Sequence, residues 1–275
     1  MNKKSIIVFC PNPSSLYTVS VCELLLNRGY SIDHIIVRKF TFKRFRTEFS
    51  RDGKRLLIKI WKKLFLKEAA YPKGTDSLPL FRSNNKLKIR NVREFKKNGT
   101  KILYCNTLND QIVEDTLKMY DDKLVVFTGG GIIRKNILDV AGDGVINCHM
   151  GILPRYKGMD LPEWCILENK TEELGITLHF MDTGIDTGYI LRKVKIPLKG
   201  YTCIKSLRNS FEPIMVKSMV DVVDDYLNGR IKPLKQESEN RRQYFIVHKK
   251  LYDLVDSKLK KRTTIANKKS KIQFI

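Results

Sequence analysis

Short apolar runs separated by helical stretches constrain the fold of this chain most strongly. Ser5–Cys10 (SIIVFC) is rich in β-branched residues and stops at Pro11, as expected for a buried strand. A helix capped by Ser14 or Ser15 follows, and residues 34–37 (HIIV) form the next strand. A strand, a helix and a second strand in this order predict a parallel sheet.

The alternation continues to about residue 200. Further strands are expected at 101–105, 124–127, 145–149, 175–180 and 190–197, and helices at 110–120, 132–140, 163–169 and 204–227. This pattern predicts an α/β fold, a Rossmann-like, mostly parallel sheet flanked by helices. We expect one catalytic domain over residues 1–200 and a mainly helical C-terminal extension over 201–275. Within this extension we expect a strand at 244–247 and a lysine-rich, frayed tail over the last 18 residues.

Residues 147–158 (NCHMGILPRYKG) carry the first candidate chemistry. Side chains alternate along a strand, so Asn147 and His149 point the same way and Cys148 points the opposite way. Asn147 offers an amide N–H, and His149 an imidazole that can be neutral or charged near neutral pH. Both lie near the carboxyl end of a predicted parallel strand, where open α/β sheets bind ligands. An isolated N-x-H is more often a buried polar strand end, so the pattern alone establishes no site.

Residues 175–188 (GITLHFMDTGIDTG) contain a second candidate stretch. Asp182 and Asp186 lie in a glycine-rich loop after a strand, where close backbone approach can bring a carboxylate to a ligand. Taken alone, an ordinary Asp-Gly turn explains this loop better.

Together, the motifs N-x-H, L-P-x-Y-x-G, G-x-T-x-H-F and D-x-G, in this order, resemble the folate-dependent formyltransferase family. The resemblance covers about residues 123–197 well and 5–37 loosely. It implies the formyltransferase fold and transfer of a formyl group from 10-formyltetrahydrofolate, the co-substrate, to a primary amine. It also implies that the catalytic residues are Asn147, His149 and Asp186.

The resemblance assigns a role to each of these side chains. Asn147 and a protonated His149 would donate hydrogen bonds to the oxygen of a tetrahedral intermediate. Asp186 would favour the charged imidazole and help to remove the proton of the amine. We prefer Asp186 to Asp182 because it directly precedes the Thr187-Gly188 step of the D-x-G motif.

In the family, the pterin is held largely by backbone groups of two loops. They correspond to the loop after the strand at 124–127 and to the loop before the catalytic Asp. The residues implied are Thr128, Gly129, Gly131, Ile132, Ile133, Met181, Asp182, Gly184 and Ile185. The glycine run at 129–131 is not a dinucleotide fingerprint, because the G-x-G-x-x-G spacing is absent.

Five positions are candidates for binding the acceptor. Ser14 and Ser15 at a helix start can hold an anion, although simple N-capping is the commoner explanation. Gly151 stands where many relatives have serine, and Tyr156 belongs to the same loop. Trp164 would lie beside the acceptor as a stacking group, or would pack in the core.

A nucleotide-linked amino sugar is the preferred acceptor, because the enzymes that formylate such sugars carry varied C-terminal extensions. Phosphoribosylglycinamide and methionyl-tRNA are the alternatives. Phosphoribosylglycinamide formyltransferases are shorter and lack a basic insert. Methionyl-tRNA formyltransferases add a C-terminal β-barrel domain, for which residues 201–275 look too short and too helical.

The formal net charge of +23 favours anionic partners such as nucleotides, folate glutamates, tRNA or an acidic membrane surface. Residues 41–73 form a basic insert with 11 Lys and Arg against 3 Asp and Glu. Its apolar residues have helical spacing and can pack on the core, or the insert can contact nucleic acid or membrane. A non-catalytic protein that binds nucleic acid or a membrane surface is therefore a further alternative.

The six cysteines are scattered without a C-x-x-C pair, which fits reduced thiols better than disulfides or zinc. The four histidines show no metal-ligand spacing, so no metal site is expected. The first apolar run is too short for a signal peptide, and no stretch approaches the roughly 20 apolar residues of a membrane helix. We expect a cytoplasmic enzyme, and a homo-oligomer is possible.

Overall fold

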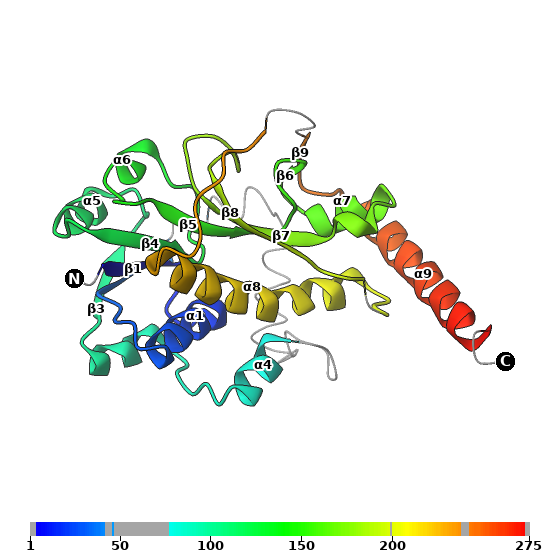
Figure 1. The fold of residues 1–275 in the computed structure, drawn as a ribbon, viewed down its shortest axis with the longest axis horizontal. Coiled ribbons are helices and arrows are strands. Elements are labelled where there is room, and N and C mark those ends of the chain that lie inside the picture. The colour runs from blue at the N-terminus through cyan, green and yellow to red at the C-terminus, as the bar shows by residue number, and fades with distance from the viewer. Residues whose placement is uncertain (1–3, 42–45, 47–76, 199, 238–241, 273–275) are drawn as a thin grey trace.

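A seven-stranded sheet organises the molecule. The computed structural model describes residues 4–41, 46, 77–198, 200–237 and 242–272. The strand order is β3-β2-β1-β4-β5-β7-β8 (Figure 1). These strands are β1 (Ser5–Cys10), β2 (His34–Arg38), β3 (Lys101–Cys105), β4 (Lys123–Phe127), β5 (Val145–His149), β7 (Gly175–Phe180) and β8 (Ile190–Lys195). Strands β1 to β5 pair in parallel, whereas β5–β7 and β7–β8 are antiparallel, which confirms the expected mostly parallel α/β sheet.

Helices cover both faces of the sheet. The α-helices are α1 (Leu16–Asn27), α4 (Leu78–Asn84), α5 (Gln111–Lys118), α6 (Lys135–Leu138), α7 (Leu161–Leu167), α8 (Ile204–Leu227) and α9 (Tyr252–Ile272). Short 3₁₀ turns lie at η1 (Val92–Asn98), η2 (Thr171–Glu173) and η3 (Lys249–Leu251). In Figure 1, α1 and α8 lie side by side over one face, and the two helices are in contact.

A hydrophobic core lies on each face of the sheet, which explains why the strands are continuous apolar runs in the sequence. In β1, Val8 joins the core that includes residues of α1 and α8, while its neighbour Phe9 joins the core that includes residues of α5 and α6. Because each face of the sheet is covered, successive side chains are both buried, as parallel sheets require. Since α8 contributes to the same core as the sheet, the division at residue 200 remains a prediction.

The helix expected at 132–140 is wrong at its start, because α6 begins only at Lys135. The amide of Asn109 donates to the carbonyl of Ile132 at 2.8 Å and accepts from the N–H of Arg134 at 2.7 Å. These two bonds hold the chain extended before α6, since Arg134 has φ −99° and ψ 167°. A side chain from a neighbouring loop thus overrides the local helical pattern.

A second, small sheet was not predicted. Strand β6 (Tyr156–Gly158) pairs in parallel with β9 (Arg242–Tyr244), so part of the expected loop at 153–162 is strand. The strand expected at 244–247 is placed too late, because β9 ends at Tyr244. Gly158 allows this pairing: it has φ +99°, and a Cβ atom there would lie 2.1 Å from the carbonyl oxygen of Tyr244.

The C-terminal extension includes a long helix. Helix α9 runs to Ile272 and so includes most of the last 18 residues, whose expected fraying stays a prediction. The basic insert at 41–73 lies outside the described residues, apart from Thr41 and Arg46. Among the helices of the described part, none combines the length and apolar character needed to cross a membrane.

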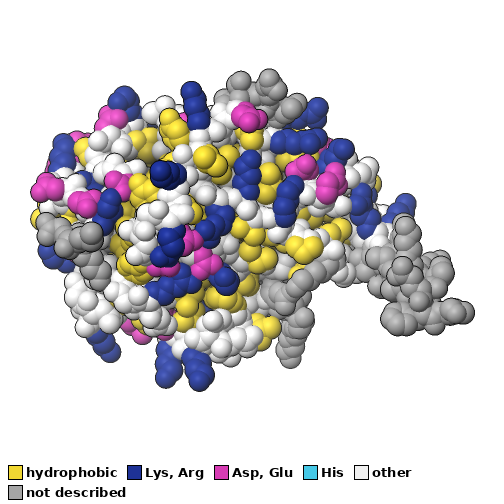
Figure 2. Space-filling view, in the orientation of Figure 1, with side chains coloured by type: hydrophobic (Ala, Val, Ile, Leu, Met, Phe, Trp, Pro, Cys, Tyr) yellow, Lys and Arg dark blue, Asp and Glu magenta, His cyan; other side chains and the backbone are white. Residues whose placement is uncertain are grey.

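Basic side chains do not gather into one patch on the face seen in Figure 2, where they are interspersed with acidic ones. Near the end of α8, Arg230 pairs with Asp224 and Asp225, and Arg28 pairs with Asp221. These described cations are therefore partly neutralised by local partners.

Candidate active site

Strands β5 and β7 bring the polar side chains of the site together. Their antiparallel register sets Asn147 opposite His179 and His149 opposite Thr177. Because side chains alternate, these four residues share one face of the sheet, while Cys148 packs in the core on the other face. The orientation expected for Asn147 and His149 follows directly from this register.

His149 is almost fully buried, with 7% of its surface exposed. Its Nε2 lies 3.0 Å from the carbonyl oxygen of Tyr156, which can only accept, so Nε2 carries the hydrogen. Its Nδ1 lies 3.4 Å from Oδ1 of Asp186. Burial lowers the pKa of His149, although Asp186 and the Tyr156 carbonyl act in the opposite direction. The lowered pKa favours the neutral ring in the free site, and the protonated His149 expected on the tetrahedral intermediate stays a prediction.

Asp186 is held in a backbone conformation that L-residues rarely adopt, with φ +51°. Its Oδ2 accepts from the N–H of Gly158 at 2.9 Å, while Oδ1 faces His149 and lies 3.8 Å from Nε2 of His179. Asp182 has a different environment, because its carboxylate accepts from Gly184 and Thr187 within its own turn. The structure thus brings Asp186, and not Asp182, against the imidazole.

His179 is a member of this cluster that was given no role from the sequence. Its Nδ1 lies 2.7 Å from the carbonyl oxygen of Phe180, and its Nε2 lies 3.2 Å from Nδ2 of Asn147. Nδ1 therefore donates to the carbonyl, and Nε2 accepts from the amide. This contact sets the orientation of the Asn147 amide and uses only one of its two hydrogens. The G-x-T-x-H-F motif contained the signal, but its pairing with β5 was needed to see it.

Acid should destabilise the fold through His179. Burial, together with the neighbouring His149, lowers the pKa of His179 to about 4, whereas an unfolded histidine titrates near pH 6.5. Between about pH 6.5 and pH 4, His179 is protonated in the unfolded state but not in the folded state. The free energy of unfolding is therefore highest above about pH 6.5 and decreases as the pH falls towards 4. We expect this group to account for roughly 3 kcal/mol of that loss. Urea unfolding at several pH values measures it, and a His179→Gln variant that keeps the full pH slope would contradict the assignment.

Thr177 fixes the loop that follows His149. Its hydroxyl donates to the carbonyl of Gly151 at 2.7 Å and accepts from the N–H of Leu153 at 3.1 Å. At Gly151, a Cβ atom would lie 2.3 Å from the side chain of Leu161 and 2.8 Å from the carbonyl oxygen of Tyr156. The backbone here is packed so closely that only glycine fits without movement.

Two of the predicted acceptor residues make contacts within the protein, and their role in acceptor binding stays a prediction. The side chain of Tyr156 is fully buried, and its hydroxyl donates to Glu168 at 2.9 Å. The indole N–H of Trp164 donates to the carbonyl of Phe245 at 2.8 Å, which is the packing alternative for this residue.

The two serines at the start of α1 also have partners within the protein. Ser15 caps the helix, because its hydroxyl accepts from the N–H of Thr18 at 3.3 Å. Ser14 accepts from the side chain of Asn91 at 3.3 Å. The structure thus shows N-capping by Ser15, and anion binding by the two serines stays a prediction.

The first predicted donor-binding loop follows β4. The Thr128 hydroxyl donates to the carbonyl of Phe9 at 2.7 Å, which ties the loop to β1. Gly129 to Gly131 all have φ above +100°, and Arg38 donates to the carbonyl of Gly130 at 3.0 Å. Ile133 is buried, whereas Ile132 has 82% of its surface exposed.

The second predicted donor-binding loop joins β7 to β8. Met181 packs against the core that includes residues of α5 and α6. The N–H of Gly184 donates to the carboxylate of Asp182 in the same turn. Ile185 has 55% of its surface exposed. Each loop therefore presents one large apolar side chain to its surroundings.

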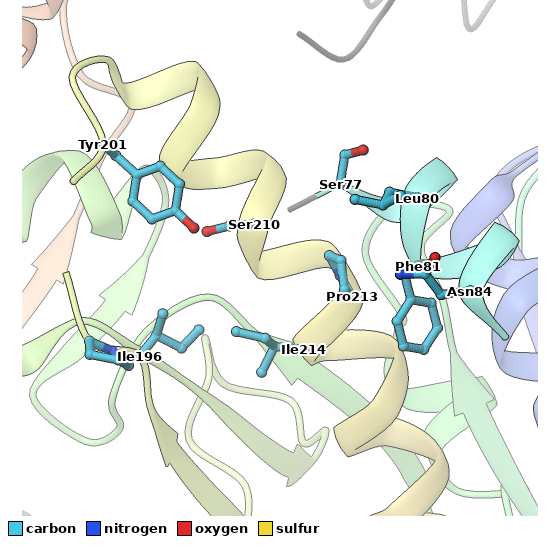
Figure 3. A pocket seen from close by; sticks show the side chains of 10 residues that line it. Ser77, Leu80, Phe81, Asn84, Ile196, Tyr201, Ser210, Pro213 and Ile214 are labelled. Carbon is cyan, nitrogen blue, oxygen red and sulfur yellow. The ribbon is translucent and has the colours of Figure 1, made fainter. Parts of the chain in front are cut away.

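Two hollows lie along α8. One, of about 280 Å³, lies between α4 and α8, and Figure 3 shows Phe81 on the α4 side and Pro213 and Ile214 on the α8 side. Among the described residues its lining has no charged side chain, so it offers no strong acid or base. The other, of about 520 Å³, reaches Met150, which follows His149 directly, and is lined by polar residues of α7 and α8.

No group of three or more His, Cys, Asp or Glu within the described ranges is arranged to hold a metal ion.

The sequence matches a family model described as formyl transferase over residues 81–223, just over half of the chain. It is similar to the methionyl-tRNA formyltransferase of Trichlorobacter lovleyi, with 32% identity over 146 residues, 53% of this chain and 46% of the relative. The corresponding protein of Clostridium tetani is 31% identical over 169 residues, 60% of this chain and 54% of the relative. The chain thus spans about half the length of the curated relatives it matches.

Solved structures resemble the fold at lower identity. An N-formyltransferase from Helicobacter canadensis, in complex with folinic acid and dTDP-3-aminofucose, matches with a TM-score of 0.56 and 16% identity, over 88% of this chain and 70% of that one. Glycinamide ribonucleotide transformylase 1 from Symbiobacterium toebii matches with a TM-score of 0.57 and 13% identity, over 86% of this chain and 96% of that one. At such identities the likeness concerns the fold alone.

Proposed function

This chain belongs to the formyl transferase family, and we propose that it transfers a formyl group from 10-formyltetrahydrofolate to a primary amine. One observation carries the proposal: the Asn147 amide, the buried His149 imidazole and the Asp186 carboxylate form a single cluster. Formyl transfer to an amine needs a donor for the developing oxyanion, a group that takes up the amine proton and a charge that stabilises the protonated group. The three side chains match these needs.

In the proposed reaction the amine adds to the formyl carbonyl, whose oxygen becomes negatively charged. The second amide hydrogen of Asn147 is donated to that oxygen. The proton of the amine passes to the pair formed by His149 and Asp186, where the carboxylate stabilises the imidazolium. When the negative oxygen re-forms the carbonyl, the bond from the formyl carbon to the donor nitrogen breaks, and the same pair returns the proton to that nitrogen, so that tetrahydrofolate and the formamide leave. We assign proton uptake rather than oxyanion binding to His149, because its Nε2 already donates to Tyr156 and burial favours its neutral form.

The donor is assigned to the loops after β4 and before Asp186. A flat pterin would cover the exposed side chains of Ile132 and Ile185, which otherwise face water. The left-handed glycines at 129–131 leave the backbone of the first loop open to close approach. The full assigned set is Thr128, Gly129, Gly131, Ile132, Ile133, Met181, Asp182, Gly184 and Ile185.

For the acceptor we propose a nucleotide-linked amino sugar. The hollow beside Met150 has a volume typical of small-molecule sites. In its lining, the buried Oε2 of Glu163 and Nδ2 of Asn209 have no hydrogen-bond partner among the described residues. Buried polar atoms normally have partners, and sugar hydroxyl groups can both donate to a carboxylate and accept from an amide.

Methionyl-tRNA is the second candidate, because the curated relatives bear that activity in their names and the net charge of +23 favours a polyanion. Phosphoribosylglycinamide is the third candidate, because it also offers a primary amine to the formyl group. A cytoplasmic location is part of the proposal and is supported by six free cysteines, five of them buried.

A panel of acceptors tests the proposal. Purified protein is mixed with 10-formyltetrahydrofolate and, separately, a nucleotide-linked 4-amino sugar, phosphoribosylglycinamide or charged initiator tRNA, and tetrahydrofolate release is followed by absorbance. Of the three acceptors, we expect only the amino sugar to cause release of tetrahydrofolate. Release only with tRNA would show that tRNA is the acceptor, and release without any acceptor would indicate a deformylase. No release, together with no folate binding by calorimetry, would favour a non-catalytic binding protein.

A further inference from the structure

The chain returns to the candidate site after α8, beyond the region that matches the family model. Leu234 and Ile190 exchange two backbone hydrogen bonds, of 2.7 and 2.8 Å, which attach the returning segment to the start of β8. Ile190 begins the strand that follows the loop bearing Asp186, so the bridge brings the returning chain beside that loop.

Gln236, two residues after the bridge, bonds to this loop directly. Its Nε2 donates to the carbonyl of Asp186 at 3.0 Å and to the carbonyl of Gly188 at 2.7 Å. Only 5% of the Gln236 surface is exposed, so water competes little for these bonds. One buried amide therefore holds the backbone on both sides of Thr187 and keeps Asp186 in its left-handed conformation.

The same returning segment makes a second attachment through β9. Tyr244 pairs with Gly158 in the small sheet, and its carbonyl accepts from the N–H of Met159 at 3.1 Å. The N–H of Gly158 is the group that donates to Oδ2 of Asp186. The segment thus contacts the backbone of Asp186 on one side and supports the donor to its carboxylate on the other.

We propose that residues 234–236 together with β9 set the position of the Asp186 carboxylate against Nδ1 of His149, and that Gln236 is a positioning residue for catalysis. The expected effect on turnover rests on the proposed function. It gives the C-terminal extension a role that neither the motifs nor the match to the family model includes.

The test compares Gln236→Met, which keeps the length of the side chain but removes its donors, with Gln111→Met. Gln111 makes an exposed side-chain bond to Asp115 on α5 and serves as the matched control. Displacing a reacting group by about 1 Å can cost about 100-fold in rate. We expect Gln236→Met to lower kcat by about that factor with KM changed by less than about twofold, and Gln111→Met to change neither.

A second readout needs no substrate. Among the residues that the structure describes, the titratable groups that face the His149 ring are Asp186 and His179, and Asp186 is the one that raises the His149 pKa. Withdrawal of the carboxylate should therefore lower the pKa of His149 further in Gln236→Met, as measured by NMR titration of the imidazole. This arm remains informative even if the parent protein shows no formyl transfer.

Kinetics are expressed per folded molecule, determined by circular dichroism, and Gln236→Leu, which also lacks donors, replaces the Met variant if that variant does not fold. A folded variant with unchanged kcat and an unchanged His149 titration would overturn the proposal. Lower kcat with an unchanged titration would also overturn it, because Asp186 would then not have moved.

Discussion

Replacing His149 by alanine should lower kcat about 1000-fold, the largest single effect we expect, since acid–base groups and charge-stabilising groups each supply factors of this order. The variant removes the group that takes up the amine proton and leaves Asp186 without its imidazole partner. Steady-state kinetics with the acceptor identified by the panel give kcat and KM separately, and KM should change little.

His34→Ala is the matched control for this prediction. His34 is likewise a buried histidine of the sheet, but its Nδ1 bonds to the hydroxyl of Tyr120 at 2.6 Å, outside the candidate site. A loss of kcat in His34→Ala equal to that in His149→Ala would show that both act through the fold rather than through chemistry.

Replacing Asn147 by alanine should lower kcat about 100- to 1000-fold, the cost measured for removal of one oxyanion donor. The effect should fall on kcat, because the hydrogen bond strengthens only as the oxygen becomes charged. Asn228→Ala serves as the control, since the amide of Asn228 donates to Tyr30 and Asp224 at the end of α8.

The double variant sharpens this prediction. If Asn147 and His149 act in one transition state, the combined loss should be smaller than the product of the two single losses. Fully multiplicative losses would mean that the two side chains act independently, and an Asn147→Ala variant with unchanged kcat would remove the amide from the mechanism.

The framework of the fold could be predicted from the sequence because it depends on local patterns. All seven strands of the main sheet lie where short β-branched runs were found, and α8 spans the residues expected. The small sheet escaped prediction because β6 and β9 have three residues each and lie far apart in the chain. Such short strands exist only through their pairing, which no local pattern encodes.

The candidate site was predictable to the extent that its residues belong to motifs. Asn147, His149 and Asp186, which belong to the motifs, fall into one cluster. His179 and Gln236 were missed because their contacts depend on strand register and on the return of the chain after α8. The effect of burial on the pKa of His149 could not be predicted either, because burial is a property of the folded chain.

The fate of a labelled formyl group tests the central claim most directly. We would mix enzyme with a small excess of 10-formyltetrahydrofolate carrying isotopic label in the formyl carbon, add the amine acceptor, and identify the labelled product by mass spectrometry. The account predicts that the label leaves the folate and appears as a formamide on the acceptor, and that with His149→Ala this transfer is about 1000-fold slower. Label that remains on the folate with every acceptor in the panel would contradict formyl transfer by this chain.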